Sequence, residues 1–361
     1  MEEIRESIPR FSLHQISGTD RSLPMSQSLW GDQETQFFFS LRPETILDAV
    51  ESLGFQTTGR CMALNSMENR VFEVEIEEGD VCSFLVAKFY RPGRWSFQQI
   101  TEEHEFLFDL EEGDIPAIAP LKIEGKSLFT LPEPSIHFCV FPRKGGRSPQ
   151  DMGIEELQIL GRLIARMHNI GASKKTPHRL QLTSQSFGMS NLQTLLSQKS
   201  IPAHLESPYQ RVVESVCKVA AQQVDNLHMY RIHGDCHWGN LLYRESEGYF
   251  FIDFDDMITG PSVQDLWLII PGQDEQALSD RAIMIESYQS MRDFDYKELQ
   301  AIEALRALRY IHFSAWISKR WEDPSFQRAF PHFSEPNYWQ QQVYDLEHQL
   351  RLMEQAKTPT Y

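Results

Sequence analysis

Two short segments concentrate the residue types that phosphoryl transfer requires. Residues 232–242 place Asp235 five positions before Asn240, and residues 249–256 bring Asp253 thirteen positions after that asparagine. Phosphoryl transfer needs a carboxylate near the attacking hydroxyl and oxygen ligands for Mg²⁺, but little covalent chemistry from the protein. We expect Asp235 to act as the catalytic base. Asn240 and Asp253 are the expected Mg²⁺ ligands, because this ion takes hard oxygen donors and few protein carboxylates.

A lysine near the end of a predicted β-hairpin is the candidate for binding nucleotide phosphates. Residues 70–76 alternate between apolar and polar, residues 77–80 form a turn, and residues 82–90 return as a strand that contains Lys88. Lys88 fits a phosphate-binding role only if a carboxylate holds its ammonium group. The alternative is an exposed lysine that ends an edge strand.

The predicted helix at residues 95–110 supplies that carboxylate. Glu103 precedes the inward-facing Leu107, so we expect Glu103 to pair with Lys88 and to support the bound cofactor nucleotide. Glu102 remains the alternative partner.

Residues 64–70 lie where a phosphate-covering loop would be, although they contain no G-x-G-x-x-G pattern. Ser66 and Asn69 can donate hydrogen bonds to phosphate oxygens through hydroxyl, amide and backbone groups. We expect Ser66 to contact ATP. A plain polar turn explains the same residues without function.

Histidine and cysteine side chains beside Asp235 raise the question of a zinc site. His233 and His237 are four residues apart with Cys236 between them, but this spacing grips a metal only on a helix. Gly234 and Gly239 indicate a loop instead. We therefore expect His233 to support the loop by hydrogen bonding and Cys236 to be inert.

Three further aspartates near the two motifs have structural explanations. Asp255 and Asp256 precede the segment 259–261 and fit a turn or a supporting role. Asp265 begins a buried apolar stretch, so it can cap a helix or brace the catalytic loop.

Composition limits the class of protein. The chain of 361 residues has 34 basic and 51 acidic residues, a formal net charge of −17, which disfavours binding to nucleic acid or to an anionic membrane. Its five cysteines include no Cys-x-x-Cys pair, and no stretch approaches the roughly 20 apolar residues of a membrane span. No secretory signal is recognisable. We expect a soluble, cytoplasmic monomer.

The chain divides into four predicted regions. Residues 1–38 lack periodicity and are expected to form a flexible extension, followed by a β-rich N-terminal lobe at 39–141. Proline and glycine predict a hinge at 142–147. A larger, mainly helical C-terminal lobe at 148–361 carries the catalytic loop.

Apolar periodicity adds secondary structure to this outline. It predicts helices at 43–53, 154–169 and 209–229, and a strand pair marked by proline at 116–130.

Taken together, several motifs resemble the aminoglycoside-phosphotransferase-like kinase superfamily and, within it, bacterial stress-response serine/threonine protein kinases. The resemblance runs from about residue 40 to the C-terminus and is carried by residues 65–70, 86–92, 233–240, 252–256, 306–309 and 316–324. It implies an α+β, bilobal, protein-kinase-like fold. ATP would lie between the lobes, with its adenine near residues 139–142.

Carried over by motif, the resemblance implies a role for each matched residue. Asp235 would be the base, Asn240 and Asp253 the Mg²⁺ ligands, Lys88 the phosphate-binding lysine and Ser66 a contact to ATP. The resemblance also implies protection against envelope or oxidative stress by phosphorylation of Ser or Thr in proteins.

Two other functions remain open at this stage. A small-molecule kinase that acts on an amino alcohol or a sugar would use the same constellation, and a cationic substrate would require an acidic acceptor pocket. A nucleotide-binding regulator without catalysis is a third hypothesis, although a regulator has no need of Asp235.

Overall fold

The computed structural model describes residue 38, residues 41–79, 81–133, 135–149 and 152–356. The predicted extension at residues 1–38 therefore lies outside the described residues, apart from Phe38, which is buried against the N-terminal sheet. No helix in the described part of the chain combines the length and apolar character that crossing a bilayer demands.

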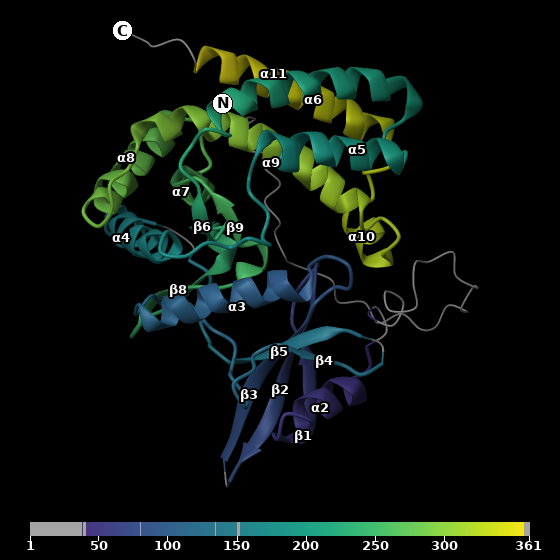
Figure 1. Cartoon of the computed structure of the whole chain (residues 1–361), viewed down its shortest axis with the longest axis vertical. Helices are drawn as coiled ribbons and strands as arrows, with labels where there is room; N and C mark the ends of the chain where they lie inside the picture. Colours follow the sequence, from purple (N-terminus) through teal and green to yellow (C-terminus); the bar gives the residue numbers. More distant parts are fainter. Residues whose placement is uncertain (1–37, 39–40, 80, 134, 150–151, 357–361) are drawn as a thin grey trace.

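The N-terminal lobe is built on a five-stranded antiparallel sheet with the strand order β1-β2-β3-β5-β4 (Figure 1). The strands are β1 (Gln56–Ala63), β2 (Arg70–Glu78), β3 (Val81–Phe89), β4 (Phe129–Thr130) and β5 (His137–Pro142). The predicted hairpin is confirmed as β2 and β3, whose register sets Val71 opposite Lys88. The central position of β3 explains why Lys88 is buried rather than exposed at an edge.

Two helices accompany this sheet. Helix α2 (Pro43–Glu51) starts with proline in its first turn and packs Ile46 and Val50 into the core of the sheet. Helix α3 (Phe97–Glu112) begins with a capping box formed by Ser96 and Gln99, and it lies between the sheet and the helical lobe (Figure 1). Both helices confirm the predictions from periodicity.

The C-terminal lobe is mainly helical around one large apolar core. Its helices are α4 (Ile154–Gly171), α5 (Ser190–Ser197), α6 (Ala203–Gln223), α7 (Ser262–Ile269), α8 (Glu275–Gln289), α9 (Ile302–Ser318), α10 (Pro324–Ala329) and α11 (Pro336–Gln355). Two small antiparallel pairs carry the polar loop: β6 (Tyr230–Ile232) with β9 (Ile258–Gly260), and β7 (Leu241–Arg244) with β8 (Gly248–Phe251). The predicted fold class, a β-rich lobe joined to a larger helical lobe, is confirmed. The exact lobe limits and the hinge at 142–147 stay predictions.

One local prediction was wrong, and the bounds of one predicted helix differ from those observed. The segment 116–130 is mostly irregular, because its prolines lack the N–H that a strand needs and Gly125 turns the chain with φ of 79°. The helix predicted at 209–229 is α6, which starts earlier and contains Pro208. Burial of Leu205 and Tyr209 on one face offsets the cost of that proline.

Helices α4 and α8 approach each other closely at Gly161. A Cβ atom there would collide with the backbone oxygen of Met284 and press on Ser287. Glycine is therefore required by packing and not by backbone conformation, and α4 in turn positions the segment that precedes the catalytic loop.

We expect Gly161→Ala to lower the free energy of unfolding by about 1–3 kcal/mol, because the added methyl group must push two backbones apart. Urea denaturation measures the change. The control is Glu155→Ala, an exposed change in the same helix, which should stay within about 0.5 kcal/mol. Equal stability of Gly161→Ala and the native chain would contradict this account of the helix pair.

Candidate active site

The loop between β6 and β7 places Asp235 and Asn240 at one end of the β7–β8 hairpin. Asn240 donates from Nδ2 to the backbone oxygen of Asp235 at 2.9 Å, and its own backbone oxygen accepts from Ile252 N at 3.0 Å. The hairpin pairs Leu241 with Phe251. The register therefore brings Asn240 beside the residues that lead into Asp253.

Asp253 has a backbone conformation that few residues adopt. Its φ of 61° lies in the left-handed region, and the side chain is 56% exposed. Aspartate tolerates this region better than most residues do, and such conformations collect at functional sites. The exposed carboxylate lies 3.7 Å from Lys88 Nζ, although the two residues come from different lobes.

The ammonium group of Lys88 is buried among carboxylates. Glu103 Oε1 lies 3.3 Å away and Asp255 Oδ1 lies 3.0 Å away, in addition to Asp253. Burial alone would lower the pKa of Lys88, but the carboxylates of Asp255, Glu103 and Asp253 outweigh it and raise that pKa above its ordinary value. Lys88 is therefore a permanent cation.

Of the two glutamates considered from sequence, the structure brings Glu103 to Lys88. Glu102 is occupied elsewhere, since its carboxylate accepts from the backbone N–H groups of His178 and Arg179.

Two arginines hold the carboxylates that surround Lys88. Arg179 donates from Nη2 to Glu103 at 2.7 Å, and Arg94 contacts both Asp255 and Asp256. Burial would raise the pKa of Asp255, yet Arg94, Lys88 and Arg179 together hold it well below the usual range. Asp255 is thus an ionised support for Lys88.

Asp235 forms three polar contacts through its carboxylate, one of which is a hydrogen bond that Oδ2 accepts from Asn240 Nδ2 at 3.5 Å. Arg309 Nη2 in α9 lies 2.7 Å from Oδ1, and His237 Nε2 lies 3.3 Å from Oδ2. Burial raises the pKa of Asp235, but Arg309 and His237 together lower it well below its usual range. The carboxylate of Asp235 is therefore ionised at neutral pH.

Buried hydrogen bonds brace this loop from behind. Asp265 accepts from the backbone N–H groups of His233 and Gly234, each at 2.9 Å, and from His168 Nε2 at 3.0 Å. His233 Nε2 lies 2.9 Å from the backbone oxygen of Ile252, as its predicted supporting role requires. Asp265 therefore braces the catalytic loop rather than capping a helix.

The zinc hypothesis finds no support among the described residues, where no group of three or more His, Cys, Asp or Glu is arranged to hold a metal ion. Cys236 is buried, and burial raises its pKa well above the ordinary value. Its thiol is therefore protonated and unreactive.

The loop between β1 and β2 is attached to the helical lobe through Glu68. The carboxylate of Glu68 accepts from Arg320 Nη2 at 2.8 Å and from Trp316 Nε1 at 2.6 Å, and it lies 3.2 Å from Arg91 Nε. Burial raises the pKa of Glu68, but neighbouring arginines lower it overall. Ser66 Oγ accepts from a backbone N–H within this loop at 3.3 Å, and its contact to ATP stays a prediction.

The sequence reasoning did not foresee most of the cations. Arg94, Arg179 and Arg309 were not selected, because no spacing or periodicity links them to carboxylates that lie far away in the chain. One chemical argument could have indicated these arginines. A cluster of ionised aspartates and glutamates buried between two lobes requires cations nearby.

The donor set fits a hard divalent cation. The Asn240 amide uses its N–H₂ group toward Asp235, which leaves its oxygen free to coordinate, and Asp253 offers an exposed carboxylate. Mg²⁺ prefers such oxygen donors and completes its coordination with phosphates and water.

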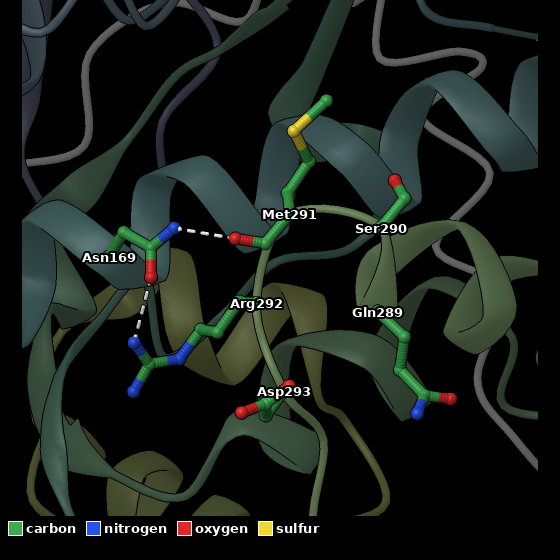
Figure 2. Close-up of a pocket in the computed structure, with 6 residues that line it drawn as sticks. All are labelled: Asn169, Gln289, Ser290, Met291, Arg292 and Asp293. Carbon is green, nitrogen blue, oxygen red and sulfur yellow. Dashed lines mark hydrogen bonds between the residues drawn. The ribbon is translucent and has the colours of Figure 1, made fainter.

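A hollow elsewhere on the surface is not the candidate site. Figure 2 shows it between the end of α4 and the turn after α8, where Asn169 donates to the backbone oxygen of Met291 and accepts from Arg292. None of the residues singled out for phosphoryl transfer lines it.

The chain matches known phosphotransferases in sequence. The family model described as "Phosphotransferase enzyme family" matches residues 61–302. The chain is 34% identical over 328 residues to "Stress response kinase A" of Escherichia coli strain K12. The matched region covers 90% of this chain and 98% of that protein. "Serine/threonine protein kinase RdoA" of Salmonella typhimurium is 33% identical to this chain, and the match again covers 90% of this chain and 98% of that protein. The resemblance inferred from the motifs is confirmed.

Solved structures share the fold at low sequence identity. An amicoumacin kinase in complex with AMP-PNP and Ca²⁺ has a TM-score of 0.64 at 17% identity, covering 82% of this chain and 92% of its own. A microcompartment-associated aminopropanol kinase has a TM-score of 0.60 at 17% identity, covering 85% and 96%. At these identities the likeness establishes the fold alone.

We expect Arg309→Gln to move the acidic limb of the pH–rate profile for phosphoryl transfer toward higher pH. Loss of the guanidinium lets the pKa of Asp235 rise, so the carboxylate becomes protonated, and activity falls, at a higher pH than in the native chain. The measurement is kcat/KM across roughly pH 4.5–8. Arg309→Lys keeps the charge and should hold the limb closer to its native position. An unshifted limb in Arg309→Gln would refute this electrostatic role.

Proposed function

The chain belongs to the phosphotransferase enzyme family, and from this premise we propose that it transfers the γ-phosphoryl group of ATP to Ser or Thr hydroxyls of proteins with Mg²⁺. The observation that carries the proposal is the convergence of Lys88 with Asp253 across the two lobes, 3.7 Å apart. An ammonium group and a metal-binding carboxylate must meet around the same triphosphate for this reaction.

The proposed step assigns one task to each group. The acceptor oxygen bonds to the γ-phosphorus while the bond from that phosphorus to the β,γ-bridging oxygen breaks, and ADP leaves. Asp235 takes the hydroxyl proton. Lys88, held by Glu103, neutralises phosphate charge, and Ser66 contacts the triphosphate from the loop above.

Asn240 and Asp253 would hold the Mg²⁺ ion. When bound, this ion neutralises charge on the phosphates and helps to orient them.

The charges beside Asp235 favour a protein acceptor over an amino alcohol. A cationic alcohol near Asp235 would meet the guanidinium of Arg309, which lies 2.7 Å from the same carboxylate. Two cations held against the same carboxylate repel each other. The printed name of the Salmonella relative, a serine/threonine protein kinase, points the same way.

The biological setting belongs to this proposal as well. Relatives at 33–34% identity are named for a stress response, and we place this kinase in such a response. ATP and reducing conditions both fit a cytoplasmic location, where five cysteines without a Cys-x-x-Cys pair would remain free. The monomeric state remains a prediction.

Asp235→Ala is expected to lower phosphoryl transfer by about 10²–10⁴-fold, because the base acts on the acceptor hydroxyl. Affinity for ATP should largely survive. Radiolabelled ATP, offered with generic protein acceptors and in parallel with a panel of small alcohols, measures transfer and identifies the acceptor class. Undiminished transfer in this variant would exclude Asp235 as the base, and labelling of alcohols alone would exclude a protein acceptor.

Asp253→Ala should remove the metal dependence of nucleotide binding, because the exposed carboxylate is the one proposed to hold Mg²⁺. Calorimetric titration with ATP, in the presence and absence of Mg²⁺, gives the comparison. In the native chain the metal should strengthen binding, whereas the variant should bind equally in both conditions. A variant that still responds to the metal would show that other residues hold it.

A further inference from the structure

One face of helix α9 carries a row of side chains with nitrogen atoms, and the first of them, Arg309, contacts Asp235. The stripe consists of Arg309, His312 and Trp316 of α9 and of Lys319, the C-cap residue that follows Ser318. These residues are three or four positions apart, so they lie along one side. Arg309 contacts the Asp235 carboxylate at 2.7 Å and its side chain is 40% exposed. Lys319 is exposed at the far end of the stripe.

A buried asparagine fixes the middle of this stripe. Asn191 of α5 is 2% exposed and lies 3.1 Å from His312 Nδ1 through its amide nitrogen, while its oxygen accepts from Lys319 Nζ at 3.2 Å. Phe187 stacks on the His312 ring with centroids 4.4 Å apart. Helices α5 and α9 run beside each other in Figure 1, as these contacts require.

Cations surround His312 in the middle of this stripe. Burial and the nearby cations Lys319, Arg309, Arg320 and Arg94 lower the pKa of His312 to about 3. His312 is therefore neutral at ordinary pH, and its Nδ1 acts as the acceptor for Asn191.

Most nearby ions are already paired, but Lys319 is not. Glu68 is shared among arginines that include Arg320, and Asp235 is paired with Arg309. Among the described residues, no carboxylate forms an ion pair with Lys319. Its ammonium group donates a hydrogen bond to the neutral amide of Asn191. In a chain with net charge −17, this exposed lysine without a carboxylate partner offers an acidic group a cation on the same stripe as Arg309.

We propose that this face of α9 recognises the acceptor, and that it selects Ser or Thr in acidic protein segments by placing an Asp or Glu of the substrate against Lys319. This inference rests on the proposed function, because it specifies the substrate of the same site. The reacting hydroxyl lies at Asp235, beside Arg309, and the substrate extends along α9 toward Lys319.

The spacing sets the register of the recognised sequence. Ten residues of helix separate Arg309 from Lys319, which corresponds to about 15 Å at 1.5 Å per residue. An extended peptide covers that length in about four to five residues. The acidic residue is therefore expected at about that distance from the phosphorylated Ser or Thr.

Matched peptides test the charge preference. Each carries one serine, with Glu, Gln or Lys placed four and five residues away on either side, and the full-length native chain phosphorylates them with radiolabelled ATP. We expect KM to be about tenfold lower for the Glu peptide than for the Lys peptide, with Gln between them. Fluorescence anisotropy with ADP present measures binding of the same peptides even if turnover is slow.

Charge reversal at Lys319 tests the residue itself. Lys319→Glu should remove the preference, so that KM for the Glu peptide rises about tenfold and KM for the Lys peptide falls. The matched control is Lys218→Glu, an exposed change on α6, which should leave the preference intact. Thermal unfolding of both variants detects a folding defect, and Lys319→Gln gives an intermediate change without an added charge.

The outcomes separate this inference from the proposed function. If peptides are phosphorylated without regard to charge, or if Lys319→Glu changes KM no more than Lys218→Glu does, the recognition surface is refuted while the protein kinase stands. If only small alcohols are phosphorylated, the protein acceptor is refuted. In that case, a preference for a hydroxycarboxylate over an amino alcohol would support recognition of negative charge by Lys319, and the reverse preference would refute it.

Discussion

The burial of the Lys88 ammonium among Glu103, Asp253 and Asp255 is the interaction on which the site depends. Lys88 and Glu103 belong to the N-terminal lobe, whereas both aspartates belong to the helical lobe. A charge withdrawn from water is costly unless partners surround it, and loss of one partner from such a cluster typically costs about 3–5 kcal/mol. The ion cluster therefore holds the lobes in the relation that phosphoryl transfer requires.

Local sequence was sufficient for features that depend on neighbouring residues and insufficient for those that depend on distant ones. The β-hairpin that carries Lys88 and the helix that carries Glu103 were predicted correctly, because strand and helix periodicity are local signals. Arg309 was not foreseen as the partner of Asp235, since 74 residues separate them. The strand pair predicted at 116–130 was wrong because its prolines cannot donate strand hydrogen bonds. The bounds of α6 differ from the prediction because burial on one face offsets the cost of Pro208.

In this fold, the residues on the nucleotide side and those on the acceptor side have different tasks. Solved relatives that act on small molecules by their titles share the fold with this chain at 17% identity. Lys88 and the aspartates are proposed to hold ATP, the co-substrate that kinases share. The acceptor differs between kinases, so the chemistry that distinguishes them belongs to the acceptor side, where we propose that the α9 face with Lys319 acts.

Surface loops usually tolerate insertions and deletions, but the loop that contains Glu68 has little freedom of this kind. Its carboxylate is held by Trp316 and Arg320 of the other lobe. One inserted residue would displace the chain by about 3.5 Å and carry Glu68 out of bonding range. A change in the length of this loop is therefore expected to break the contacts between the lobes that Glu68 makes.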